Sequence, residues 1–294
     1  AFSVFMLAEE AGGDPPVQHT LSVTNDGNGS VALSPAGPVY NAGTVVTLTP
    51  VPAAGYQFSG WTGDNAADLV DNGNGTWSIT MDADKSVHAN FVEFSGWVAY
   101  NDCAWVSGQL DGNITKYTIT SGSTTGPLKD YYTGANTGVT ATFTSSGSPQ
   151  VQTMSGYSGE EANPGTDAYN TFHGIVSMPG VIQYGNQGWW VEVTFTGLDP
   201  DKTYTFATTG NRGDSSYTDR IARFTISGVA GANNASTLGV TIESNESVTF
   251  STGSNTEKGY VARWTGIQPG SDGSFAVRAE AGTSERRAYA FSVF

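Results

Sequence analysis

The chain has 294 residues, only 13% of them charged, and a formal net charge of −15. A surface this acidic repels phosphate backbones, so the composition argues against a nucleic-acid-binding protein. The single cysteine, Cys103, excludes an internal disulfide, and no stretch reaches the roughly 20 apolar residues of a membrane-spanning helix.

The first five residues recur at the other end of the sequence. Residues 1–5 and 290–294 are both Ala-Phe-Ser-Val-Phe, and residues 11–16 form a linker rich in Gly and Pro. We expect residues 1–10 to be the terminal strand of a preceding copy, in a protein whose copies follow one another head to tail. The expected contacts between copies are apolar: Phe2, Val4, Phe5, Met6, Leu7, Phe291, Val293 and Phe294. Copies fused in one polypeptide and separate chains joined by strand exchange both fit this pattern.

Residues 17–92 have the pattern of a small β-rich domain. Apolar and polar residues alternate, and turn residues such as those at 25–29 separate the alternating runs. The expected strands are residues 20–24, 30–34, 43–50, 55–61, 75–81 and 86–91. We expect Pro50 to end the third of them.

Four spaced motifs in this region resemble a known family. They are residues 28–31, 40–48, 53–61 (Ala-Ala-Gly-Tyr-Gln-Phe-Ser-Gly-Trp) and 81–87, in that order. Together they resemble the divergent internalin-B-type repeat of bacterial surface proteins. The resemblance implies a small β-rich spacer module of extracellular proteins that carries no catalytic residues.

Residues 93–294 have the pattern of a larger β-sandwich, with many short alternating runs between Gly, Asn and Ser turns. The expected strands are residues 97–100, 115–120, 139–144, 189–196, 203–209, 220–226, 247–251, 260–265 and 274–279. Residues 166–172 are the one expected short helix.

Residues 165–169, 189–206, 211–212 and 266–275 of this region are similar to galactose-binding-like jelly-roll modules of secreted bacterial proteins. The predicted fold class is therefore all-β: a small β-rich repeat module and a larger jelly-roll β-sandwich, linked in tandem. The resemblance implies a sugar-binding role for residues 93–294.

The sequence offers no support for an enzyme. The three histidines, His19, His88 and His173, are not at metal-ligand spacing, and no nucleophile elbow or phosphate loop is present. We therefore expect no catalytic residues and no cofactor, with structural calcium as one possibility. Its expected ligands are the carboxylates of Asp102, Asp111, Glu161 and Asp167.

Two aromatic pairs are candidates for stacking on glycans: Trp189 with Trp190, and Tyr131 with Tyr132. Adjacent residues of a strand point to opposite faces, so one member of the Trp189–Trp190 pair is expected in the core. Packing and subunit contacts are the alternative role for all four rings. The sequence thus predicts a repeat unit of an extracellular bacterial surface or filament-forming protein, with a structural and adhesive role and copies of itself as partners. The alternative is a carbohydrate-binding module accessory to a secreted enzyme.

Overall fold

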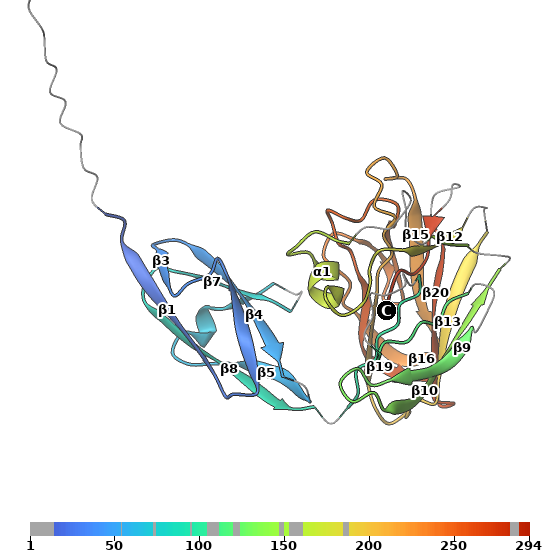
Figure 1. Ribbon diagram of the computed structural model, residues 1–294, viewed down its shortest axis with the longest axis horizontal. Coiled ribbons are helices and arrows are strands. Elements are labelled where there is room, and N and C mark those ends of the chain that lie inside the picture. Colours follow the sequence, from blue (N-terminus) through green and yellow to red (C-terminus); the bar gives the residue numbers. More distant parts are fainter. Residues whose placement is uncertain are drawn as a thin grey trace, which may run out of the picture. The chain divides into compact units, whose positions relative to one another are not determined.

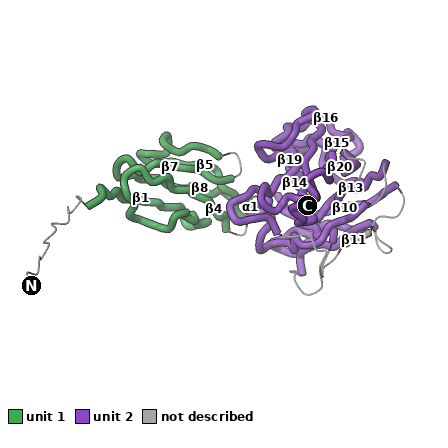
Figure 2. Tube along the Cα trace, turned by 90° about the horizontal axis from the view of Figure 1, so that it is seen from above, with its two compact units in different colours: residues 1–94 green, residues 95–294 purple. Residues whose placement is uncertain are grey.

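A computed structural model of the chain describes residues 15–53, 55–72, 75–94, 96–104, 112–119, 124–146, 150–152, 161–184, 188–282 and 288–294. The chain divides into two compact units, residues 1–94 (unit 1) and 95–294 (unit 2), which Figure 2 shows in different colours. Nearly all of the regular structure is strand (Figure 1), which confirms the predicted all-β fold class. The strand predicted at residues 1–10, and residues 11–14 of the predicted linker, lie outside the described residues.

Unit 1 consists of two four-stranded sheets with a shared core. The first sheet has the order β3-β1-β8-β5 and the second has the order β2-β4-β7-β6. The first contains β1 (Gln18–Asn25), β3 (Val39–Asn41), β5 (Tyr56–Thr62) and β8 (Lys85–Glu93). The second contains β2 (Gly29–Ser34), β4 (Val45–Pro52), β6 (Val70–Asp71) and β7 (Trp77–Thr80), and the short 3-10 helix η1 (Ala66–Asp68) precedes β6. Alternate residues of both sheets fill the core: Leu21, Tyr40, Val46, Leu48, Ile79, Met81 and Val87.

Strand β4 does not end at Pro50, as the sequence predicts, but continues to Pro52. β7 pairs with β4 only as far as Leu48, whereas β2 pairs along the whole of the strand's second half. At Pro50, β4 therefore has a hydrogen-bonded neighbour on the β2 side only. A proline, which has no backbone N–H to donate, is tolerated at such a position.

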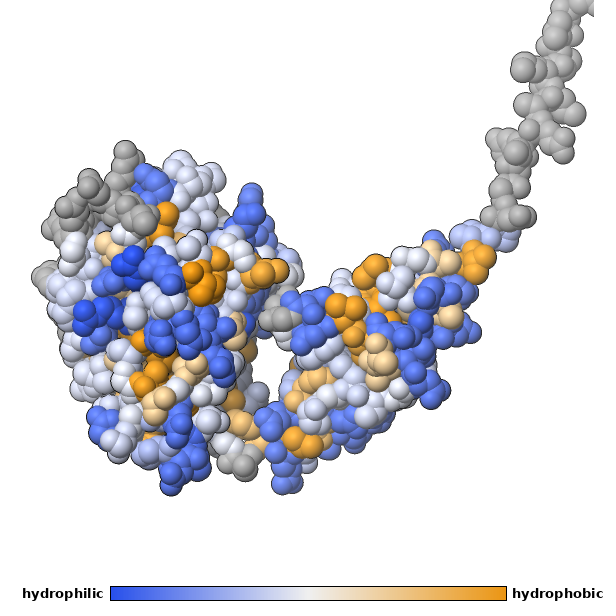
Figure 3. Space-filling view, turned by 180° about the vertical axis from the view of Figure 1, so that it is seen from behind, coloured by the Kyte–Doolittle hydropathy of each residue, from blue (hydrophilic) through white to orange (hydrophobic). Residues whose placement is uncertain are grey.

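The outer faces of unit 1 carry hydroxyl and amide side chains that bond across strands. Thr24 Oγ1 lies 2.8 Å from His88 Nδ1, and the Asn90 amide donates to Thr62 Oγ1 at 2.9 Å. Exposed valines lie among them, and Figure 3 shows apolar surface alternating with hydrophilic surface on the face of unit 1 that it draws.

In the described residues of unit 2, the strands form one large sheet and two small ones. The large sheet is antiparallel throughout, with the order β17-β18-β15-β20-β13-β10-β9. Its strands are β9 (Thr125–Lys129), β10 (Asn136–Ser145), β13 (Trp190–Thr196), β15 (Ile221–Ser227), β17 (Thr241–Ser244), β18 (Ser247–Ser251) and β20 (Ser274–Ala281). The first small sheet has the order β14-β19-β16 and consists of β14 (Tyr204–Thr208), β16 (Val229–Asn234) and β19 (Ala262–Pro269). The second has the order β11-β12-β21 and consists of β11 (Gln150–Gln152), β12 (Val181–Tyr184) and β21 (Ala288–Tyr289).

The last segment of the chain, residues 288–294, lies in the interior of unit 2. Its backbone bonds to Ile182 on β12, to Thr209 after β14 and to Asn101. Phe291, Val293 and Phe294 are 0%, 0% and 6% exposed and pack on the two hydrophobic clusters of unit 2. This corrects the prediction that these three side chains contact another copy, because the unit's own core surrounds them. Phe2, Val4, Phe5, Met6 and Leu7 lie outside the described residues.

Two expected strands of unit 2 are not strands. The amide of Val98 donates to the side chain of Asp130, and the carbonyl of Val98 accepts from the amide of Tyr131, so residues 97–100 bond to a turn instead of a neighbouring strand. Residues 115–119 form a single bridge, Thr115 with Asn101, because the Asn101 side chain accepts from the amide of Tyr117.

The expected helix is present as α1 (Asp167–Phe172), which the Thr166 side chain caps by accepting from the amide of Tyr169. It is six residues long, and within the described parts of the chain no helix has the length and apolarity to cross a membrane.

Candidate functional site

Three tyrosines gather beside the turn that joins β9 to β10. The ring of Tyr131 lies edge-on to Tyr100 and to Tyr132, with 5.3 and 5.2 Å between the ring centroids. Tyr100 and Tyr131 are partly buried against the smaller hydrophobic cluster of unit 2, whereas Tyr132 is 42% exposed. We call these three residues the tyrosine cluster. It presents one exposed ring, Tyr132, which contacts Tyr131, and Tyr131 in turn packs on Tyr100.

The buried carboxylate of Asp130 holds the turn in place. It accepts from the amide and the hydroxyl of Thr133 at 2.8 and 2.7 Å, and from the amide of Val98 at 3.1 Å. Burial raises the pKa of Asp130, but the hydrogen bonds from Thr133 and Val98 outweigh it, and the pKa lies below its ordinary value. The carboxylate is therefore ionised at neutral pH, and it ties the residue after Tyr132 and the segment at Val98 to the start of the turn.

The phenol groups of Tyr100 and Tyr132 stay protonated at neutral pH. Burial, with smaller contributions from Tyr132 and Tyr131, raises the pKa of Tyr100 to about 12. Burial and the neighbouring Tyr131 and Asp130 raise the pKa of Tyr132 as well. The exposed Tyr132 phenol can therefore donate a hydrogen bond to a ligand while its ring offers an apolar face.

The Trp189–Trp190 pair is not a stacking platform. Trp189 is 2% exposed and stacks on Tyr184 inside the core, at 5.2 Å between ring centroids. The guanidinium of Arg278 lies 4.3 Å from the ring centroid of Trp190 and donates to Glu192 at 2.8 Å. One face of Trp190 is thus occupied by a cation of its own chain.

Asp102 is a buried carboxylate with one unsatisfied oxygen. It is 1% exposed, and its Oδ1 accepts from the amide of Ala104 at 3.0 Å. Its Oδ2 has no hydrogen-bond partner among the described residues. Burial raises the pKa of Asp102 to about 7, and the backbone amide of Ala104, the charge of Lys116 and the backbone of Ser177 offset that rise only in part.

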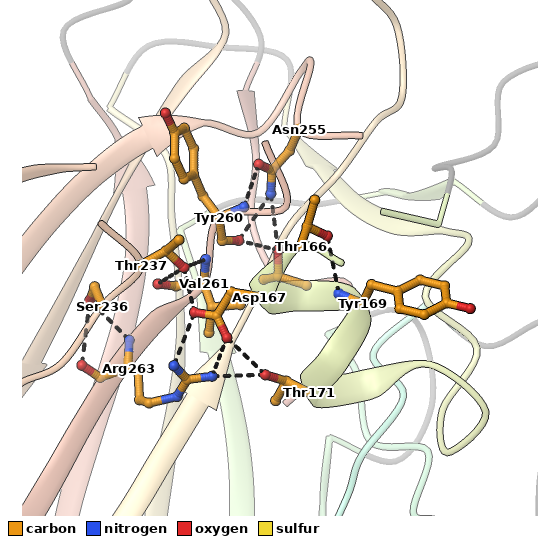
Figure 4. Close-up of polar contacts among 11 residues, drawn as sticks. Thr166, Asp167, Tyr169, Thr171, Ser236, Thr237, Asn255, Tyr260, Val261 and Arg263 are labelled. Carbon is orange, nitrogen blue, oxygen red and sulfur yellow. Dashed lines mark hydrogen bonds and ion pairs between the residues drawn. The ribbon is translucent and has the colours of Figure 1, made fainter. Parts of the chain in front are cut away.

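Asp167 is bound by an arginine, so it is not a free metal ligand. Arg263 donates to both its carboxylate oxygens, at 3.0 and 2.7 Å, and Thr237 donates to Oδ2 at 2.6 Å (Figure 4). Thr171 on the same helix donates to Oδ1 at 3.1 Å. The Asp167 and Arg263 side chains are only 2% and 16% exposed. This network connects α1 to β19, and Tyr169 points away from it (Figure 4).

Three of the four predicted calcium ligands, Asp102, Glu161 and Asp167, lie within the described residues. Glu161 bonds to the ring of His173, which stacks on Tyr169 at 4.0 Å between ring centroids. Asp167 is bound by Arg263, Asp102 accepts a hydrogen bond through Oδ1, and Asp111 lies outside the described residues. Where the chain is described, no three His, Cys, Asp or Glu side chains are grouped to hold a metal ion. Structural calcium stays a prediction.

Cys103 is fully buried, and the side-chain amide of Asn101 donates to its sulfur at 3.3 Å. Burial and the nearby Asp102 raise the pKa of the thiol well above its ordinary value, so little of the reactive thiolate forms. The thiol is a packing group of the core.

Sequence reasoning missed three members of these sites. Tyr100 stands apart from the Tyr131–Tyr132 pair in the sequence, Asp130 resembles any aspartate of a turn, and Arg263 is 96 residues from Asp167. Only the Asp130-x-x-Thr133 spacing, typical of a side chain that bonds to its own turn, could have signalled its role.

One comparison with known proteins finds a match. Residues 19–95 match the family model of the divergent InlB B-repeat domain, which supports the resemblance found in unit 1. This domain is typical of bacterial surface proteins. Neither the curated proteins nor the solved structures give a match to the chain. The galactose-binding-like jelly-roll assignment of unit 2 therefore stays a prediction.

Proposed function

We propose that this chain is a structural and adhesive part of an extracellular bacterial surface or filament-forming protein. Unit 1 is the spacer, and unit 2 is a rigid β-sandwich that makes the contact. The observation that supports this role best is how buried charges are used. Asp167 forms an ion pair with Arg263, and Asp130 accepts hydrogen bonds from its own turn, so both carboxylates fix the shape of the unit.

The cell-surface location is tested on the bacterium that makes the protein. Intact cells are treated with a protease that cannot enter them, and the protein is followed with an antibody against unit 1. We expect its loss from intact cells while a cytoplasmic marker protein survives. A protein that survives until the cells are lysed contradicts the proposal.

The second candidate function is binding of a neutral carbohydrate through Tyr132. An exposed aromatic ring offers a flat apolar face to the C–H groups of a pyranose. Its turn is held by the Asp130 hydrogen bonds, so little conformational entropy is lost when a ligand binds. A chain of net charge −15 also favours an uncharged glycan over an acidic one.

Carbohydrate binding is tested by the mobility of the full chain in native gels that contain xylan, galactomannan or a β-glucan. We expect one of these polysaccharides to slow the migration of the wild-type chain. Tyr132→Ala should abolish this effect and Tyr132→Phe should preserve it, because the ring supplies the contact. Leu238→Ala removes an apolar side chain that is 97% exposed elsewhere on unit 2, and it is the matched control. No retardation by any of the three, or retardation that Tyr132→Ala leaves unchanged, rejects the site.

Head-to-tail association of copies is the remaining part of the proposal. The expected observation is a mass above 30.7 kDa that grows with concentration in light scattering. A constant mass of one chain over the whole range would rule out association between separate chains.

A further inference from the structure

We propose that unit 1 resists tension along the polypeptide, with the parallel β1–β8 pair as the element that bears the load. This is a mechanical function of unit 1 alone and does not depend on a ligand of unit 2. It follows from which strands are paired and in which direction they run.

The first and last strands of unit 1 are neighbours and run in the same direction. Leu21 lies opposite Lys85, and the register continues to Asn25 opposite Ala89. Figure 1 shows the two strands side by side. The chain enters β1 at one end of the pair and leaves β8 at the other, towards unit 2. A pull on the two sides of the unit therefore slides β1 along β8 and loads all the bonds of the ladder together.

The opposite arrangement would be weak. If the two strands were antiparallel, the chain would enter and leave at the same end, and a pull would separate the hydrogen bonds one after another. Breaking several hydrogen bonds at once by shear has a higher free-energy barrier than breaking them one after another. This barrier governs the rate of forced unfolding.

Two carboxylates extend the pair beyond its backbone register. At the start, Asp84 accepts from the amide of Thr20 at 2.7 Å, and at the end, Asp26 accepts from the amide of Phe91 at 2.6 Å. That hydrogen bond from Phe91 is the main reason that the pKa of Asp26 lies below its ordinary value. Each carboxylate ties one strand to the other just outside the ladder.

The pair is also held by its neighbours in the sheet. β5 pairs with β8 on its other side, from His88 to Glu93, and β3 pairs with β1 at Gln18–Thr20, just before the β1–β8 register begins. The inward residues Leu21, Val87 and Ala89 are at most 2% exposed. Sliding β1 along β8 therefore breaks core packing together with hydrogen bonds.

The test is single-molecule force spectroscopy of the full chain, with handles on two introduced cysteines. Val17→Cys with Glu93→Cys pulls the pair in shear, and Val17→Cys with Ala83→Cys pulls it open from one end. All three positions are exposed, and the native Cys103 is fully buried and does not take a handle. Unit 2 is outside the pulled segment in both variants. Each variant's thermal unfolding is recorded as well.

We expect the shear variant to unfold at roughly twice the force of the other variant or more, because its bonds share the load. Equal or lower force in shear, at similar thermal stability, overturns the proposal. A protein found inside the cell would refute the surface location and leave this result unaffected.

A second variant separates the clamp from general stability. Asp26→Ala removes the hydrogen bond between Asp26 and the amide of Phe91 and should lower the unfolding force in shear. The unfolding force of the Val17→Cys/Ala83→Cys variant should change little, because pulling from that end of the pair reaches this hydrogen bond last. Asp26→Asn keeps an acceptor and should restore part of the shear force. Asp64→Ala, at another exposed turn position of unit 1, is the control. An equal loss of force in both directions would mean a loss of stability, not of a clamp.

Discussion

At the scale of single residues, Asp102 makes the stability of the protein depend on pH. Its pKa is raised from 3.8 to about 7 in the folded protein. Between these values the folded chain holds a proton that the unfolded chain releases. The free energy of unfolding therefore falls as the pH rises through this window, and the contribution of Asp102 is constant above it. The full effect corresponds to roughly 4 kcal/mol.

Asp102→Asn tests this prediction, because the amide is neutral at every pH and similar in size. We expect the variant to match the wild type near pH 4 and to exceed it increasingly up to pH 8, by as much as about 4 kcal/mol. Urea unfolding across that pH range measures the difference. Asp201→Asn, at an exposed turn position, is the control. Parallel curves for wild type and Asp102→Asn would contradict the prediction.

The Asp167–Arg263 pair predicts a large loss of stability from a small change. Asp167→Asn leaves the Arg263 cation buried without its counter-charge, which costs about 3–5 kcal/mol when one partner of a buried pair is removed. The more exposed Glu192–Arg278 pair is the comparison, and Glu192→Gln should cost about 1 kcal/mol or less. Chemical denaturation of both variants gives the two values. Equal losses would mean that burial of the pair does not matter.

At the scale of secondary-structure elements, the sequence predicted correctly those features that depend only on neighbouring residues, such as the alternation of a strand and the cap of a helix. Val191, Val193 and Phe195 alternate with polar residues and form the inward face of β13, as expected. Thr166 marks the start of α1 by its capping oxygen. The parallel β1–β8 pairing was not predictable, because it joins the two ends of unit 1 and no periodicity within either strand records its partner.

The candidate site, too, depends in part on contacts between distant segments that the sequence pattern does not record. Tyr132 was predicted as a stacking candidate from its neighbour Tyr131, and it lies exposed. Trp190 was also predicted, but Arg278 from β20 covers one of its faces, which only the register of β13 with β20 decides. Burial of Asp102 likewise depends on contacts between distant segments, such as its bridge to Val293.

The last segment, residues 288–294, is an element on which unit 2 depends. Phe291 is fully buried, with its ring edge-on to Phe143 and Phe224 at 6.0 and 5.8 Å between centroids. Phe291→Ala should therefore destabilise unit 2 by about 3–5 kcal/mol. Tryptophan fluorescence during urea unfolding follows the change. A cost near zero would mean that this ring has no packing role and would again make it available for contact with another copy.

At the scale of the whole molecule, the two units have separate hydrophobic cores. Leu48 belongs to the core of unit 1 and Phe224 to that of unit 2, and both are fully buried. We therefore expect Leu48→Ala to lower one transition in calorimetry of the full chain, and Phe224→Ala to lower the other, each by several degrees. If both variants shift the same transition, the two units unfold as one cooperative body.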